Sequence, residues 1–136
     1  MKGLNKVEQI LWNYRKNAES LKDMKKELSG LMSVQGASYK AHAMNGVSEP
    51  VLELVSRIIS MEKRIASLER EVEAVENLAS SLDIREKNMY QMSMILRYRY
   101  VKHIEHEAVM RQLGMSKATY FRRSGELLRL AGKYVR

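Results

Sequence analysis

The feature that most constrains the fold is an apolar repeat between residues 51 and 82. Apolar residues recur there in alternating steps of three and four for more than four heptads. This spacing places them on one stripe of an α-helix and is typical of a coiled-coil seam. Such a helix needs a partner, either in the same chain or in a second copy. The repeat consists of Val51, Leu54, Ile58, Met61, Ile65, Leu68, Val72, Val75, Ala79 and Leu82.

A second apolar stripe, near the start of the chain, is the candidate partner. One of its slots is occupied by Lys25, whose stem we expect to lie along the seam with its ammonium group in water. We expect this segment to fold back across a linker at 29–48 as an antiparallel hairpin, with a dimer built upon it. Ser48 and Pro50 predict the start of the second helix. The stripe consists of Leu4, Val7, Leu11, Tyr14, Ala18, Leu21 and Leu28.

The composition favours helices throughout. The chain of 136 residues has one proline, Pro50, and long stretches rich in the residues that lose least on entering a helix. We therefore predict an all-α protein. The absence of cysteine argues against disulfides and zinc-thiolate sites and favours a reducing compartment. Because no apolar run approaches the roughly 20 residues that span a bilayer, we expect a soluble, cytoplasmic protein without membrane contact.

The net charge of +8 lies entirely in the C-terminal part of the chain. Residues 1–83 contain twelve Lys or Arg and twelve Asp or Glu, so they carry no net charge. Residues 84–136 contain twelve Lys or Arg against four Asp or Glu and hold the whole excess. A local basic field of this kind indicates a surface that binds a polyanion.

Residues 104–135 show the pattern of two short helices joined by a tight turn. Gly114 can take a positive φ at the end of the first helix, and Ser116 can cap the second by accepting a backbone N–H. Tyr120 and Leu127 fall on the apolar face of the second helix. The side chains that we expect on its outer face are Lys117, Thr119, Phe121, Arg122 and Arg123.

Three stretches of this region carry a family resemblance. They are Ile95-Leu96-Arg97-Tyr98-Arg99-Tyr100-Val101, then Leu113-Gly114-Met115-Ser116-Lys117-Ala118-Thr119-Tyr120-Phe121-Arg122, then Leu127-Leu128-Arg129-Leu130-Ala131. Together they resemble the C-terminal module of phage late-gene transcription activators of the RinA and ArpU kind, which is similar to region 4 of bacterial sigma factors. The resemblance covers about residues 85–135. The helical segments before it also look like the two-helix arm of small phage proteins of this group.

The chain departs from the family pattern at four positions. His103 stands where these modules usually place glycine, and Glu105 where they place a capping Ser or Thr. Met110 replaces an alanine of the first helix, which requires a wider helix crossing or a bent side chain. Arg123 occupies a position that is often apolar.

The resemblance implies a sequence-specific transcription regulator, encoded by a phage or prophage, that binds double-stranded DNA. The helix after Ser116 would be the recognition helix, with Arg122 and Arg123 on guanines or phosphates and Lys117 and Thr119 on the backbone. Activation of late genes and contact with RNA polymerase are family properties that the residues leave open. The assigned DNA-binding residues are Ser116, Lys117, Thr119, Arg122, Arg123, Arg111, Lys102 and Arg99, with Arg97, Arg129 and Lys133 adding positive field.

Catalysis, metal binding and a cofactor are not expected. His103 and His106 lie three residues apart, but no third ligand points to the same place, so we predict no metal. The chain has no glycine-rich phosphate loop, no thiol and no carboxylate pair outside the flanks of the apolar repeat, which argues against an enzyme.

The predicted organisation is therefore a helical hairpin or coiled-coil arm at 1–83, followed by a sigma region 4-like helix-turn-helix domain at 84–136.

Two other functions are compatible with the same combination of helical arm and basic C-terminal module. One is a DNA-recognition subunit of phage packaging, similar to a small terminase, although such proteins usually place the DNA module first. The other is a coiled-coil adaptor whose basic end docks an acidic protein. A ring of eight or more subunits would favour packaging, and an absence of salt-dependent DNA binding would favour the adaptor.

Overall fold

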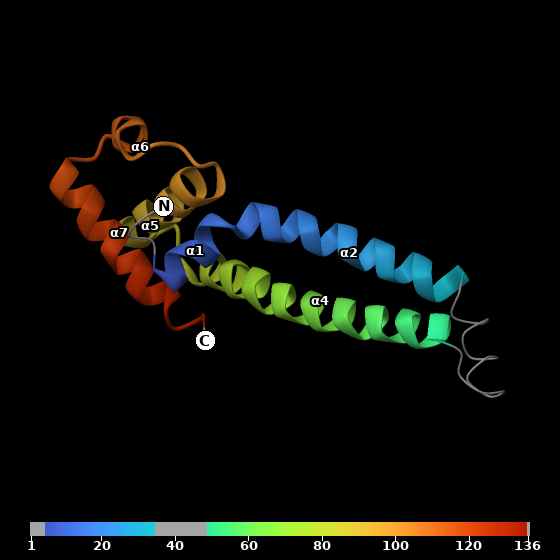
Figure 1. Cartoon of the computed structure of the whole chain (residues 1–136). Helices are drawn as coiled ribbons and strands as arrows, with labels where there is room; N and C mark the ends of the chain where they lie inside the picture. The colour runs from blue at the N-terminus through green and yellow to red at the C-terminus, as the bar shows by residue number, and fades with distance from the viewer. Residues whose placement is uncertain (1–4, 35–48, 136) are drawn as a thin grey trace. The chain divides into compact units, whose positions relative to one another are not determined.

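The computed structural model describes residues 5–34 and 49–135, and all regular secondary structure in these ranges is helical (Figure 1). The prediction of an all-α protein is confirmed. No helix in the described ranges combines the length and the apolar character that crossing a membrane requires. The elements are α1 (Lys6–Trp12), α2 (Tyr14–Val34), α4 (Glu49–Ser81), α5 (Lys87–Ile95), the π-helix η1 (Leu96–Val101), α6 (His106–Leu113) and α7 (Lys117–Ala131).

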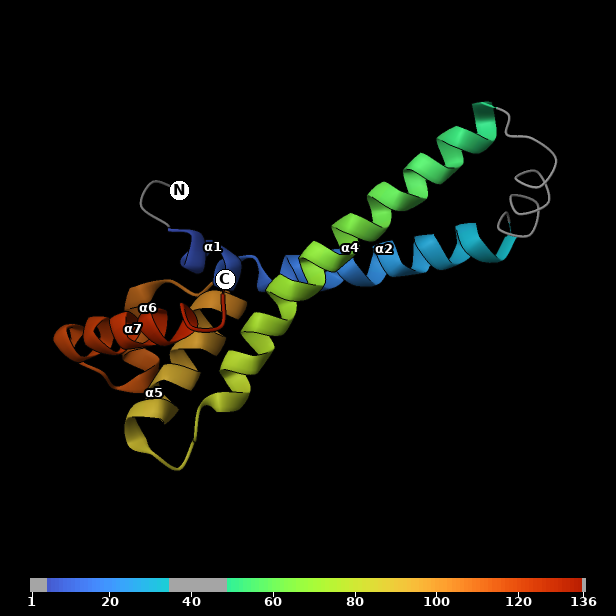
Figure 2. The ribbon, with the colours of Figure 1, turned by 90° about the horizontal axis from the view of Figure 1, so that it is seen from below.

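The chain divides into two compact units. Unit 1 contains the described parts of Met1–Asn17 and Glu71–Arg136, and unit 2 contains the described part of Ala18–Arg70. This division differs from the predicted boundary between residues 83 and 84. The reason is that α1 and the last turns of α4 share one core with α5, α6 and α7 (Figure 2).

Unit 1 has a continuous apolar core to which all its helices contribute. Leu11 of α1, Ile95 of α5, Val109 of α6, and Tyr120 and Leu127 of α7 are each 0% exposed. Burial of this kind stabilises a fold by about 25 cal/mol for each Å² of apolar surface removed from water. The core therefore fixes α6 and α7 against each other and against α1. Further members are Ile10, Val75, Leu78, Leu82, Met92, Leu96, Tyr100 and Ala131.

The first apolar stripe is split between two helices. The Asn5 side chain caps α1 by accepting the backbone N–H of Glu8 at 2.8 Å, and α1 ends at Asn13, with φ −91° and ψ 4°. The sequence pattern, which begins at Leu4 outside the described residues, predicted one uninterrupted helical face. The break lets Ile10, which the pattern omitted, enter the core beside its neighbour.

The helical stretch from Lys87 to Val101 consists of two elements. After α5, the backbone widens into η1, in which the Lys102 N–H donates to the Arg97 carbonyl at 3.0 Å. Tyr100 is buried in this element, and its hydroxyl donates to the Glu8 carboxylate of α1 at 3.2 Å. Burial and the Glu8 charge raise the pKa of Tyr100, so the phenol stays protonated. π-helical turns of this kind frequently occur at functional sites.

Unit 2 consists of facing parts of α2 and α4, which lie beside each other (Figure 1). Ion pairs join Lys25 to Glu69 at 3.3 Å and Glu27 to Arg57 at 3.1 Å, so the later residue of α2 pairs with the earlier residue of α4. The two helices are therefore antiparallel here. The ammonium of Lys25 reaches a carboxylate, as a stem lying along the seam allows.

Seam residues of unit 2 are less deeply buried than the core of unit 1. Leu21, Val51 and Ile65 are buried, whereas Leu28, Leu54, Ile58, Met61 and Leu68 are only half-buried. Two further apolar residues of α4, Leu52 and Ile59, are 54% and 47% exposed.

One helix boundary differs from the sequence prediction, and another agrees with it. Helix α2 continues through Gly30 to Val34, so the first residues of the predicted 29–48 linker are helical, and 35–48 lie outside the described residues. Helix α4 begins at Glu49, with Pro50 in its first turn as predicted, and the expected Ser48 cap also lies outside them. Near the end of α4, Leu78 is buried and Ala79 is exposed, whereas the apolar repeat predicts that Ala79 faces inward. The buried stripe shifts along the helix because an α-helix has 3.6 residues per turn and a heptad seam has 3.5.

Candidate nucleic-acid interface

The turn between α6 and α7 has the predicted geometry. Gly114 ends α6 in the left-handed region, with φ 64° and ψ 35°, where a residue with a Cβ is strained. The Met115 N–H donates to the Met110 carbonyl at 2.9 Å, and Ser116 caps α7 by accepting the Thr119 N–H at 3.2 Å. The expected glycine and serine roles are confirmed.

Four exposed residues of the first two turns of α7 form what we call the leading edge. Phe121 among them is 45% exposed, a high value for a large apolar side chain. Within the described parts of the chain, the side chains of Lys117 and Arg122 have no hydrogen-bond or ion-pair partner, so both charges are available to a ligand. The leading edge consists of Lys117, Ala118, Phe121 and Arg122.

An open groove of about 970 Å³ adjoins the leading edge. Its lining mixes aromatic rings, cations and two carboxylates, so the positive field is concentrated where Arg111 and Lys117 stand and not over the whole groove. The lining residues are Trp12, Arg99, His103, Glu105, His106, Glu107, Met110, Arg111, Lys117 and Phe121.

A stack of three side chains holds the connection before α6. The rings of Trp12 and His103 are parallel within 6° and 3.8 Å apart, and the His103 ring nitrogen Nε2 lies 2.7 Å from the Trp12 carbonyl oxygen. His103 has φ 59°, in the left-handed region that glycine adopts without strain and other residues rarely occupy. The ring contacts with Trp12 offset the backbone strain that a non-glycine residue carries there.

The sequence predicts Arg99 on the DNA-binding surface, but in the structure Arg99 belongs to this stack. Its guanidinium carbon lies 4.7 Å from the centre of the Trp12 ring, and its Nη1 donates to the Ile104 carbonyl at 3.1 Å. Arg99 is therefore half-buried and fixes the backbone between η1 and α6.

A second aromatic contact ties α6 to α7. The Nδ1 atom of His106 lies 2.6 Å from the Tyr120 hydroxyl oxygen, at the point where the two helices meet. Burial, followed by the charge of Arg99, lowers the pKa of His106, while burial raises that of Tyr120. These shifts favour the neutral imidazole and the neutral phenol, which can share one hydrogen bond between Nδ1 and the hydroxyl oxygen.

The other residues that the sequence analysis assigned to DNA binding differ in their exposure. Arg97, Lys102, Arg111, Arg129 and Lys133 are exposed, with Lys102 also 5.0 Å from the Tyr98 ring centre. The hydroxyls of Ser116 and Thr119 are used within the cap, where Ser116 donates to Thr119 Oγ1 at 2.9 Å. Arg123 is internal.

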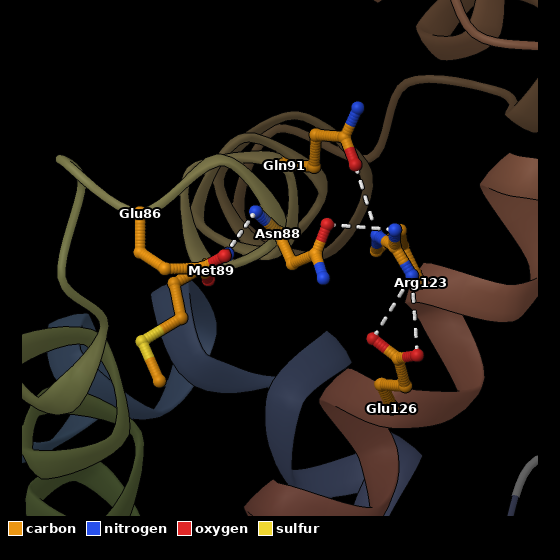
Figure 3. Close-up of polar contacts among 6 residues, drawn as sticks. All are labelled: Glu86, Asn88, Met89, Gln91, Arg123 and Glu126. Atoms are coloured by element: carbon orange, nitrogen blue, oxygen red, sulfur yellow. Dashed lines mark hydrogen bonds and ion pairs between the residues drawn. The ribbon is translucent and has the colours of Figure 1, made fainter.

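The expectation that Arg123 faces outward beside Arg122 is wrong. Its side chain is 12% exposed and forms an ion pair with Glu126 at 3.1 Å. Hydrogen bonds to Asn88 and Gln91 occupy the rest of the guanidinium (Figure 3). A sequence signal was present, because Arg123 follows the buried Tyr120 by three residues and precedes the buried Leu127 by four. This spacing places Arg123 beside the apolar face of α7 and Arg122 on the opposite side.

Sequence reasoning also missed Trp12, which lies some 90 residues before the groove residues that it contacts. Its only sequence signal is that it is the single tryptophan and directly precedes the break at Asn13. Within the described ranges, no three His, Asp or Glu side chains gather as metal ligands, and the two histidines contact different aromatic rings.

No protein-family model, curated protein or solved structure matches the chain.

Proposed function

We propose that this protein is a sequence-specific transcription regulator that binds double-stranded DNA with α7 as the recognition helix. The observation that carries the proposal is the leading edge, where Lys117 and Arg122 are exposed and unpaired at the start of a helix. It lies in the part of the chain that holds the whole net charge of +8. The antiparallel α2 and α4 would serve as the arm of the helix-turn-helix module.

The chemistry of the leading edge suits a major groove. A guanidinium such as that of Arg122 can bind guanine O6 and N7 in bidentate fashion, and an exposed aromatic edge such as Phe121 can contact a thymine methyl group. Lys117 occupies the first position of α7, where the helix dipole also favours a phosphate. Arg111 of α6 supplies a further phosphate contact.

The carboxylates of the groove limit the orientation of the duplex. Glu105 and Glu107, at the start of α6, repel phosphates, so the backbone would approach from the side of Arg111 and Lys117. The DNA therefore contacts the rim of the groove and not its floor.

The role in transcription rests on the resemblance to phage late-gene activators. The stretches that carry it fall on η1, on the turn between α6 and α7, and on the second half of α7. Of these, the turn is the part whose geometry matters for DNA, because it sets the direction of the recognition helix. Late-gene activation and contact with RNA polymerase belong to the same proposal.

The experiment is selection of bound sequences from a random duplex pool, followed by affinity measurements over a range of salt concentrations. Arg122→Ala should weaken binding to the enriched duplex by about 1–3 kcal/mol if it reads a base. Lys117→Ala should weaken all duplexes alike and reduce the salt slope by about one. Lys63→Ala, which removes an exposed cation of α4, is the matched control and should change neither.

Two outcomes of this experiment contradict the proposal. Wild-type protein that enriches no sequence and binds duplexes without salt dependence would favour the adaptor function instead. Equal affinities of wild type, Arg122→Ala and Lys117→Ala would show that DNA binds elsewhere.

We further propose that the protein self-associates through unit 2. Leu52 and Ile59 are exposed and stand seven residues apart on α4, the spacing of one heptad seam. Light scattering should give a dimer for the wild type and a monomer for Leu52→Lys with Ile59→Lys. A wild-type monomer would contradict self-association, and a ring of eight or more chains would favour the packaging function.

A further inference from the structure

The guanidinium of Arg123 is enclosed by three acceptors. Its Nε donates to Gln91 Oε1 at 2.9 Å, Nη2 donates to Asn88 Oδ1 at 2.7 Å, and Nη1 donates to both carboxylate oxygens of Glu126 at 3.1 and 3.2 Å. Figure 3 shows the side chain crossing from α7 towards the polar face of α5. A contact between Arg123 and DNA would compete with these bonds.

The acceptors on α5 are themselves held in place. Asn88 stands in the first turn of α5, and the Glu86 side chain caps that turn by accepting the N–H groups of Asn88 at 3.2 Å and Met89 at 2.8 Å (Figure 3). One turn further on, Met92 and Ile95 anchor α5 in the core of unit 1. Arg123 thus connects α7 to a helix whose position the core and a cap both fix.

The rotation of α7 decides which of two neighbouring arginines faces outward. Successive residues of an α-helix are separated by about 100° around its axis, since a turn contains 3.6 residues. Arg122 and Arg123 are chemically identical, so side-chain type cannot select between them. The buried Tyr120 and Leu127 place Arg123 beside the inner face of α7, and Asn88 and Gln91 of α5 bind it there, which leaves Arg122 on the leading edge. Glu126 lies on α7 itself and turns with it.

The apolar contacts of α7 are less directional than this set of bonds. Tyr120 and Leu127 bury the inner face of α7, but packing contacts have no preferred donor-acceptor angle. A planar guanidinium fork bonded to the two acceptors on α5, Asn88 and Gln91, constrains both distance and angle. The set therefore limits small rotations of α7 that the apolar core would tolerate.

We propose that Arg123 is a positioning residue, which sets the angle at which Arg122 and Lys117 are presented, and that it does not itself contact DNA. This inference rests on the proposed DNA-binding function. The bonds between Arg123 and α5, inside the protein, would then contribute to the discrimination between DNA sequences.

The test compares affinity for the duplex enriched by wild type with affinity for a scrambled duplex of equal length. Arg123→Lys keeps the charge but loses the fork, and it should lower this specificity ratio by about tenfold. Its salt slope on the scrambled duplex should equal that of wild type, because no phosphate contact is lost. Far-UV circular dichroism should show unchanged helix content.

A second variant removes the same bonds by changing their acceptors on α5. Asn88→Ala with Gln91→Ala removes two acceptors and leaves both arginines in place, and it should lower the specificity ratio as Arg123→Lys does. The matched control is Arg122→Lys, which should lower the ratio without lowering the thermal midpoint, since Arg122 has no partner within the described residues. Both positioning variants should lower that midpoint.

Each remaining outcome overturns either the inference or its premise. A lower thermal midpoint with an unchanged specificity ratio would mean that Arg123 only stabilises the fold. A specificity ratio that stays at the wild-type value in Asn88→Ala with Gln91→Ala, but falls in Arg123→Lys, would mean that Arg123 reads DNA directly. If the wild-type protein shows no salt-dependent duplex binding, the proposed function itself is refuted. The measurement on the wild type alone tests that function.

Discussion

The two units bury their apolar residues to different depths. In unit 1, five large side chains from four helices are 0% exposed, whereas the best-buried seam residue of unit 2, Ile65, is 7% exposed. Unit 1 also contains aromatic contacts and a part-buried ion pair, whereas the ion pairs of unit 2 are exposed. Unit 1 is thus built to fix the direction of individual side chains, and unit 2 to keep two helices together.

The largest effect is expected on the free energy of unfolding, when one buried residue of each unit is replaced by alanine. Leu127→Ala leaves a cavity in the core of unit 1 and should lower the free energy of unfolding by about 3–5 kcal/mol. Ile65→Ala, in the shallower seam, should cost about 2 kcal/mol, because neighbouring side chains can relax into the space. Urea unfolding followed by far-UV circular dichroism measures both. Equal losses would show that the units are packed alike.

A smaller effect is expected from Trp12→Ala, which removes the stack with His103 and the contact with Arg99. Stacked rings and a cation over a ring contribute about 0.5–1.5 and 0.5–1 kcal/mol, so we expect a loss of about 1–2 kcal/mol. His103→Gly is the informative partner variant, because it removes the same stack but also relieves the backbone at φ 59°. It should therefore cost less than Trp12→Ala in urea unfolding. A greater cost would mean that the backbone strain is insignificant.

The smallest effect concerns pH and the contact between His106 and Tyr120. The pKa of His106 is lowered in the folded state from 6.5, so the unfolded chain binds the proton more readily. The stabilisation is complete above pH 6.5 and is lost progressively as the pH falls through 6.5 towards the folded-state pKa. His106→Gln should make the urea midpoint less dependent on pH between 5 and 7. An identical pH dependence in wild type and variant would show that His106 does not titrate abnormally.

Much of the fold follows from local patterns. The apolar repeat predicts α4, and Gly114 and Ser116 mark the turn before α7, because the left-handed backbone and the serine cap depend only on neighbouring residues. Features that depend on distant partners were not predictable. The Trp12 stack joins residues some 90 positions apart, and the orientation of Arg123 depends on Asn88 of another helix.

The candidate site shows the same distinction. Lys117 and Arg122 lie on the outer face that helical periodicity predicts, whereas the bonding partners of Arg99 and Arg123, the Ile104 carbonyl and Asn88, do not follow from any periodicity. Charge alone could not separate the two pairs, since all four residues belong to the same basic segment. The two pairs differ in their hydrogen bonds, because Arg99 and Arg123 have side-chain partners in the folded structure.

The central claim is that duplex DNA contacts the leading edge of α7. The most direct test is to record backbone amide chemical shifts of the full chain by NMR while adding the duplex enriched from the random pool. The account predicts the largest changes over residues 116–122, smaller changes near Arg111, and little change over residues 50–70 of α4. Changes concentrated on α2 and α4, with the signals of 116–122 unmoved, would contradict it.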